Sequence, residues 1–213
     1  MSQPISLKAA ERKVFHTVFN DGLWDIFLGC FLLIFAIAPL LSASLGDFWS
    51  SVVFLPFWGL VYLGIRLVRT YVVNPRVGRV EFGKLRKAKL VRFNLVMLIF
   101  NFLTLILGFL FARNFGRFPA QMPTMILGML LLLAFSIGGY FLDFKRLYIY
   151  GLMVGFSPLI GEWLYTYRNA SHHGFPITFT IAAGTMIVVG LALFIRFLNK
   201  FPVSINGISA ENS

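Results

Sequence analysis

Long apolar runs separated by short polar or basic stretches dominate the pattern along this chain. Six runs cover residues 24–44, 49–68, 91–112, 123–142, 147–165 and 176–198. Each has about the 20 residues that a helix needs to cross a hydrocarbon core about 30 Å thick. Because the runs are continuously apolar and lack the alternation of barrel strands, helices are favoured. We therefore predict an all-α integral membrane protein with a six-helix transmembrane domain over residues 23–198.

The Lys and Arg residues indicate the direction of these helices. With six spans, 16 of the 19 basic residues fall in the N-terminal segment, the second and fourth connections and the C-terminal end. The other three, Arg113, Arg117 and Arg168, fall on the opposite side. Basic residues of short loops stay on the cytoplasmic side. The sequence therefore predicts a multi-pass protein of the cell inner membrane with both termini in the cytoplasm.

The two terminal segments are predicted to be cytoplasmic, at residues 1–22 and 199–213. Within the first, residues 7–19 have the pattern of an amphipathic helix, with apolar side chains on one face and charged ones on the other. Such a helix lies in the headgroup plane of the membrane. It is either an anchor that starts the first span or a gate or docking element.

Composition supports the membrane prediction. Hydrophobic residues make up 58% of the chain and charged residues 13%, whereas soluble domains have about 45–50% and about 25%. The formal net charge of +11 raises the question of nucleic acid in a soluble protein. Here the charges lie between apolar runs, so we predict contact with the bilayer and its anionic lipid, and no nucleic acid partner.

The connection at residues 69–90 is predicted to be a basic cytoplasmic loop. Pro75, Gly78 and Gly83 are typical of turns. The candidate docking residues for a partner or for lipid are Arg76, Arg79, Lys84, Arg86, Lys87 and Lys89. Three interpretations compete: contact with anionic lipid, docking of a partner protein, and binding of a phosphorylated ligand. The last is the weakest because no phosphate-loop spacing is present.

Two short patterns resemble those of small uncharacterised bacterial polytopic membrane proteins. They are Asp21-Gly22-Leu23-Trp24-Asp25-Ile26 and Pro75-Arg76-Val77-Gly78-Arg79-Val80. The resemblance covers roughly the first 90 residues and implies no activity.

Polar and small residues inside the spans are candidates for function because membrane helices place them inward. Gly151, Gly155 and Glu162 fall on one face of the fifth span, and the two glycines are predicted to pack against another helix. Asp25 lies near the inner end of the first span and Asn101 near the middle of the third. We predict Glu162, Asp25 and Asn101 as candidates for an ion or ligand pathway.

Each of these three has a simpler interpretation. Glu162 is alternatively an interface carboxylate bonded to Arg168, Trp163 or a tyrosine. Asp25 is alternatively a cap of the first span, and Asn101 a group that hydrogen-bonds between helices.

The two halves of the chain contain weakly similar dipeptides in the same order. Leu28-Gly29 resembles Leu127-Gly128, and Gly59-Leu60 resembles Gly151-Leu152. A unit of three helices that is repeated once must be inverted in the membrane, as in many transporters. The pattern is therefore consistent with a 3+3 inverted repeat.

Known catalytic and metal-binding motifs are absent from the sequence. Cys30 is the only cysteine. His172 and His173 are neighbours in one loop, and two neighbouring histidines make a poor tetrahedral set of metal ligands. We predict no metal, no cofactor and no enzymatic activity. A lipid-modifying enzyme that uses Glu162 with these histidines is the enzymatic alternative.

Two functions follow from these patterns. The first is a small transporter or permease whose helices bend at Pro39, Pro56 and Pro158. The alternative is a non-transporting subunit or scaffold that docks a cytoplasmic partner or stabilises a larger membrane complex. A homo-oligomer or a membrane-complex partner fits either function.

Overall fold

The computed structural model describes residues 21–77, 84–114 and 121–202. The predicted amphipathic helix at residues 7–19, and also Arg79 and Arg117, lie outside this part of the chain. The described elements are α2 (Leu23–Val52), α3 (Phe54–Val68), a π-helical segment (Arg69–Val73), α4 (Asn74–Val77), α5 (Lys84–Arg113), α6 (Met122–Leu142), α7 (Arg146–Arg168), a 3₁₀ turn (His172–Gly174) and α8 (Phe175–Lys200).

Six helical stretches in the described residues are long and apolar enough to cross a membrane. They are Leu23–Gly46, Phe48–Arg76, Lys87–Arg113, Met122–Leu142, Arg146–Arg168 and His172–Lys200. The prediction of an all-helical protein with six helices long and apolar enough to cross a membrane is confirmed for this part of the chain, as a multi-pass membrane protein requires.

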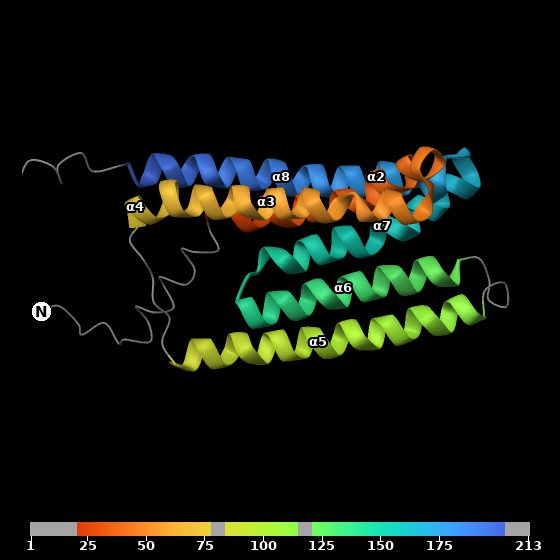
Figure 1. The fold of residues 1–213 in the computed structure, drawn as a ribbon, viewed down its shortest axis with the longest axis horizontal. Coiled ribbons are helices and arrows are strands. Elements are labelled where there is room, and N and C mark those ends of the chain that lie inside the picture. The colour runs from red at the N-terminus through yellow and green to blue at the C-terminus, as the bar shows by residue number, and fades with distance from the viewer. Residues whose placement is uncertain (1–20, 78–83, 115–120, 203–213) are drawn as a thin grey trace, which may run out of the picture.

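In Figure 1, α5, α6 and α7 lie side by side, while α2, α3 and α8 gather on the other side of α7. α5 packs on α6, α6 on α7, α7 on α8, α8 on α2, and α2 on α3. The buried core lies where α2, α7 and α8 meet, and includes Leu32, Val154, Phe179 and Met186. α3 and α5 therefore form the edges of the bundle and contribute little to its core.

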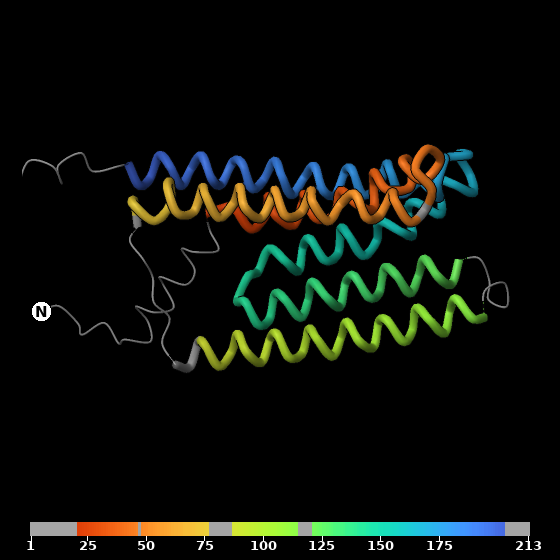
Figure 2. Tube along the Cα trace, in the orientation of Figure 1, coloured from red at the N-terminus to blue at the C-terminus, as the bar shows by residue number. Residues whose placement is uncertain are grey.

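Gly46 lies between the first two spans, within the residue range of α2. Its φ of 78° lies in the left-handed region, which glycine adopts without steric cost. Figure 2 shows the chain turning back here, at the end of the bundle opposite to the one where α3 finishes. α2 and α3 thus form an antiparallel pair.

The second span continues beyond the predicted end at Val68. A π-helical segment (Arg69–Val73) and α4 (Asn74–Val77) extend it through Pro75. Proline has no N–H for the usual hydrogen bond, and the wider π turn directly before it changes the hydrogen-bond register. The segment predicted as a loop at residues 69–90 is therefore helical at Arg69–Val77, and again from Lys84 onward.

Two glycines allow α2 and α8 to approach closely. A Cβ on Gly29 of α2 would lie 2.8 Å from the carbonyl oxygen of Ala183 on α8, and a Cβ on Gly190 of α8 would lie 2.8 Å from that of Gly22. Real Cβ atoms essentially never come within 3.0 Å of another heavy atom. The tight contact between α2 and α8 therefore depends on the absence of side chains at these positions.

The helix contacts differ between the two halves of the chain. In the second half, α7 packs directly on α8. The corresponding helices of the first half, α3 and α5, do not pack on each other in the described chain. The inverted repeat therefore stays a prediction that these contacts do not support.

Candidate functional site

The end of the bundle where α2 and α7 begin holds a buried carboxylate with two partners. Asp25 of α2 is 0% exposed. Its Oδ2 accepts a hydrogen bond from the Arg146 guanidinium at 3.0 Å, and its Oδ1 accepts one from the Tyr150 hydroxyl at 2.6 Å. The Arg146 guanidinium also lies 4.8 Å from the centre of the Phe144 ring. Because Arg146 and Tyr150 belong to α7, this cluster connects α2 with α7.

Asp21, which directly precedes α2, forms a second buried pair at the same end. Its Oδ1 accepts the backbone N–H of Leu23 at 3.0 Å, and its Oδ2 accepts a hydrogen bond from Arg69 at 3.0 Å. Burial raises the pKa of the Asp21 carboxyl, and the Arg69 charge partly offsets this rise. The Arg69 guanidinium lies 5.9 Å from the Trp24 ring centre. This pair connects the start of α2 with the π-helical segment.

A third pair connects α5 with the end of α6. The Lys89 ammonium donates to Asp143 Oδ2 at 3.0 Å and lies 5.8 Å from the Tyr140 ring centre. Asp143 ends α6 in the left-handed conformation. Both charged side chains are about one-third exposed, at 32% each. Surface pairs of this kind contribute about 0–1 kcal/mol.

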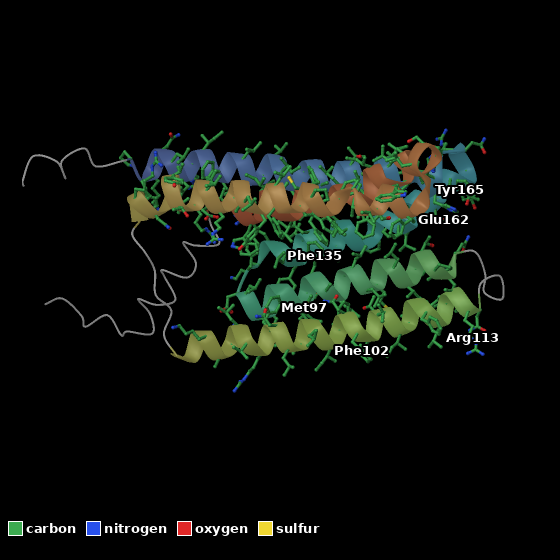
Figure 3. The ribbon with its side chains drawn as sticks, in the orientation of Figure 1. Met97, Phe102, Arg113, Phe135, Glu162 and Tyr165 are labelled. Atoms are coloured by element: carbon green, nitrogen blue, oxygen red, sulfur yellow. The ribbon has the colours of Figure 1, made fainter. Side chains whose placement is uncertain are left out.

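Glu162 forms the fourth pair, near the opposite end of α7 (Figure 3). Its Oε2 lies 2.9 Å from Nδ1 of His173, in the 3₁₀ turn before α8. The His173 ring is 4.4 Å from the ring centre of Tyr165. The Glu162 side chain is 11% exposed and that of His173 is 56% exposed. Water therefore reaches the histidine more readily than the carboxylate.

The turn that carries His173 is tightly constrained. His172 and His173 have φ angles of 50° and 54°, in the left-handed region. A Cβ on Gly161 of α7 would lie 2.7 Å from the His173 carbonyl oxygen. This close approach of the turn to α7 holds the imidazole beside Glu162.

An apolar layer separates the Asp25 cluster from the Glu162–His173 pair. Between Tyr150 and Glu162, α7 rises about 18 Å at 1.5 Å per residue. The face of α7 in this interval contains Val154 and Pro158, and Val154 belongs to the same buried core as Phe179. Asp25 and Glu162 therefore belong to two separate sites.

Asn101 lies away from both clusters. It is exposed on α5, which packs on α6 in the described structure. The structure thus does not bring together the three residues predicted to form a pathway. A pattern within each helix could not reveal this, because it does not indicate which helices are neighbours.

The predicted docking residues have different environments. Arg76 donates from Nη1 to the Val72 carbonyl oxygen at 2.7 Å. Lys87 is exposed, whereas Lys89 is engaged by Asp143. Lys84 and Arg86 lie in α5, but their side chains are outside the described residues, as is the whole of Arg79.

The two glycines predicted to pack against a helix, Gly151 and Gly155, belong to α7 and pack against α6. A Cβ on Gly151 would come within 2.9 Å of Phe135 Cβ, and one on Gly155 within 2.9 Å of Leu132 Cβ. A Cβ on Gly128 of α6 would in turn overlap the Gly155 carbonyl oxygen. The contact between α6 and α7 is thus close on both sides.

The partners of Asp25, Arg146 and Tyr150, were not predicted from the sequence. For Glu162, Arg168, Trp163 or a tyrosine was the predicted structural partner, and His172 and His173 were grouped with it only in the enzymatic alternative. The available signal was an excess of basic and aromatic side chains at the same predicted membrane depth. Using it requires the order of the helices in space.

No protein-family model, curated protein or solved structure matches the chain.

Proposed function

We propose that this protein is a non-transporting membrane subunit or scaffold, the second of the two functions considered from the sequence. The observation that carries this proposal is the pairing of its carboxylates. Each carboxylate whose side chain is described between residues 21 and 202 has a basic partner on another segment. The pairs are Asp21–Arg69, Asp25–Arg146, Asp143–Lys89 and Glu162–His173.

Such pairs favour a fixed assembly of helices. A charge in a membrane is costly unless it is paired or wet, so separating Asp25 from Arg146 would leave two charges without compensation. An ion pathway needs ionisable groups that exchange partners along a continuous route. The apolar layer around Val154 and Phe179 lies across the direct line along α7 from Asp25 to Glu162.

The cationic residues at the start of α5 are the proposed contact for a cytoplasmic partner. Lys87 is exposed and Lys89 is held by Asp143. We therefore place docking on Lys84, Arg86 and Lys87. This side faces the cytoplasm if the predicted orientation holds.

The test is to change Lys84, Arg86 and Lys87 to Gln and to measure which proteins co-purify from native membranes in mild detergent. A matched control changes Lys145, Arg196 and Lys200 to Gln, which removes the same charge from the same predicted side. We expect the first variant to lose a stoichiometric partner and the control to keep it. Equal retention by both variants would contradict docking at α5.

A transporter is the second candidate because of the surroundings of Glu162. The Glu162–His173 pair is partly open to water, and Pro158 interrupts the backbone hydrogen bonds of α7 one turn away. If this pair lines a pathway, Glu162→Gln in liposomes abolishes proton or cation flux while Asp143→Asn does not. The scaffold proposal predicts no flux that depends on Glu162.

A further inference from the structure

One face of α5 has the spacing of a helix–helix seam but meets no other helix in the described structure. Its residues alternate in steps of three and four: Val91, Asn94, Leu98, Asn101, Leu105 and Gly108. All six are exposed, with 66% of Val91, 66% of Leu98 and 70% of Leu105 accessible. α5 is also the only candidate span in the described residues with no buried residue in its most apolar stretch.

The neighbouring face of α5 provides an internal comparison. It consists of large apolar residues, all exposed: Leu95, Ile99, Phe102, Ile106 and Phe109. Figure 3 shows Phe102 on the side of α5 away from α6. This second face is what lipid contact alone requires, and it contains no amide or glycine. The first face contains two amides and one glycine at intervals of seven residues, so contact with lipid does not account for it.

The two amides carry a cost in lipid. A side-chain amide has donors and acceptors that hydrocarbon cannot satisfy. Neither Asn94 nor Asn101 meets a hydrogen-bond partner in the described part of the chain. By contrast, the Thr104 hydroxyl on the same helix donates to the Phe100 carbonyl oxygen at 2.9 Å. The amides, above all Asn101 near the middle of the predicted span, thus lack a partner among the described residues, and a neighbouring chain can supply one.

We propose that the seam binds the α5 helix of a second copy of this protein. Two copies inserted with the same topology have parallel α5 helices, so each residue meets its own counterpart at the same depth. An amide both donates and accepts, and Asn94 and Asn101 can therefore pair with themselves, whereas a lone carboxylate or ammonium would repel its copy. The repeat of seven residues favours a left-handed helix pair, and Gly108 lets the backbones approach.

This inference rests on the proposed scaffold function, since a dimer is one assembly that a scaffold forms. Interhelical hydrogen bonds of polar side chains in membranes are modest. Asn101→Leu should therefore raise the dissociation constant of the dimer in lipid about 3- to 20-fold. Leu is a stronger helix former than Asn, so the variant keeps the structure of α5.

Cysteine cross-linking in liposomes tests the seam with pairs of adjacent positions. In a Cys30→Ser background, Leu98→Cys and Leu105→Cys place a thiol on the seam and retain both amides. Ile99→Cys and Ile106→Cys are controls at the same depth on the neighbouring face. We expect disulfide-linked dimers at Leu98 and Leu105 that exceed those at Ile99 and Ile106 at least several-fold, and that persist when lipid is added in excess.

A second variant separates the amide mechanism from general helix contact. Adding Asn94→Leu and Asn101→Leu to Leu98→Cys should reduce cross-linking to the level of the Ile99 control. Equal cross-linking on both faces, or unchanged cross-linking after both Asn substitutions, would overturn the inference.

Native membranes distinguish this inference from the proposed function. If Leu98→Cys there cross-links a different protein and never a second copy, the inference fails and the scaffold proposal stands. If α5 yields no cross-link, the inference fails alone, and the Lys84, Arg86 and Lys87 variant still decides the scaffold proposal.

Discussion

α7 and α5 are both membrane spans, but their environments are opposite. Half of the residues in the most apolar stretch of α7 are buried, whereas none is buried in that of α5. α7 nevertheless has the lowest hydropathy of the six candidate spans in the described chain, and α5 shares the highest. In a bilayer the buried helix is the one with more polar groups, because protein can satisfy them and lipid cannot.

The comparison predicts that the largest loss of stability follows from breaking a pair on α7. Asp25→Ala leaves the Arg146 charge without its buried carboxylate, which typically costs about 3–5 kcal/mol. Asp143→Ala removes the exposed pair with Lys89 and should cost at most about 1 kcal/mol. Unfolding of both variants in mixed micelles measures the difference. Equal losses would show that burial at α7 does not set the energetics.

Packing against α7 should give the next largest effect. Gly128→Val forces a branched side chain against the Gly155 carbonyl and should destabilise the protein by about 1–3 kcal/mol. Gly59→Ala on α3 is the control, since a Cβ there meets nothing within 4 Å. The same unfolding assay should find the control unchanged or slightly more stable. A stable Gly128→Val variant would contradict the close contact between α6 and α7.

Truncation of apolar side chains should show the same contrast on a smaller scale. Val154 on α7 is 0% exposed and Phe102 on α5 is 62% exposed. Val154→Ala leaves a cavity and should cost about 1 kcal/mol, although it removes fewer atoms than Phe102→Ala. Phe102→Ala should leave the free energy of unfolding nearly unchanged because lipid fills the space. A greater loss for Phe102→Ala would reverse the assignment of core and edge.

The smallest predicted effect is a pH dependence from Asp21. Burial raises the pKa of this carboxyl above its ordinary value of 3.8, with Arg69 partly opposing the rise. The native state then keeps a proton that the unfolded chain has released. Stability therefore falls as pH rises from about 3.8 to the raised pKa, by at most about 1.4 kcal/mol per pH unit, and is constant above it. Asp21→Asn should remove this slope in micelle unfolding between pH 4 and 7, and a slope that persists would have another origin.

The sequence predicted the spans well and the site only in part. Continuous apolar runs determine which segments enter the membrane, so the six spans could be identified from length and hydropathy. The partner of Asp25 could not be identified, because Arg146 is 121 residues away in sequence and becomes its neighbour only through the order in which the helices pack. His173 is only 11 residues from Glu162, which is why the sequence could group the two. The helical path through Pro75 was also missed, since it depends on the π turn of Arg69–Val73.

The central claim is that this chain assembles with other chains and does not act alone as a permease. The most direct test is the mass of the protein released from native membranes in lipid nanodiscs, together with the identity of every chain in the particle. The account predicts at least one further chain per particle, either a cytoplasmic partner or a second copy of this protein. Particles that hold one lone chain, combined with ion flux that disappears in Glu162→Gln, would contradict it.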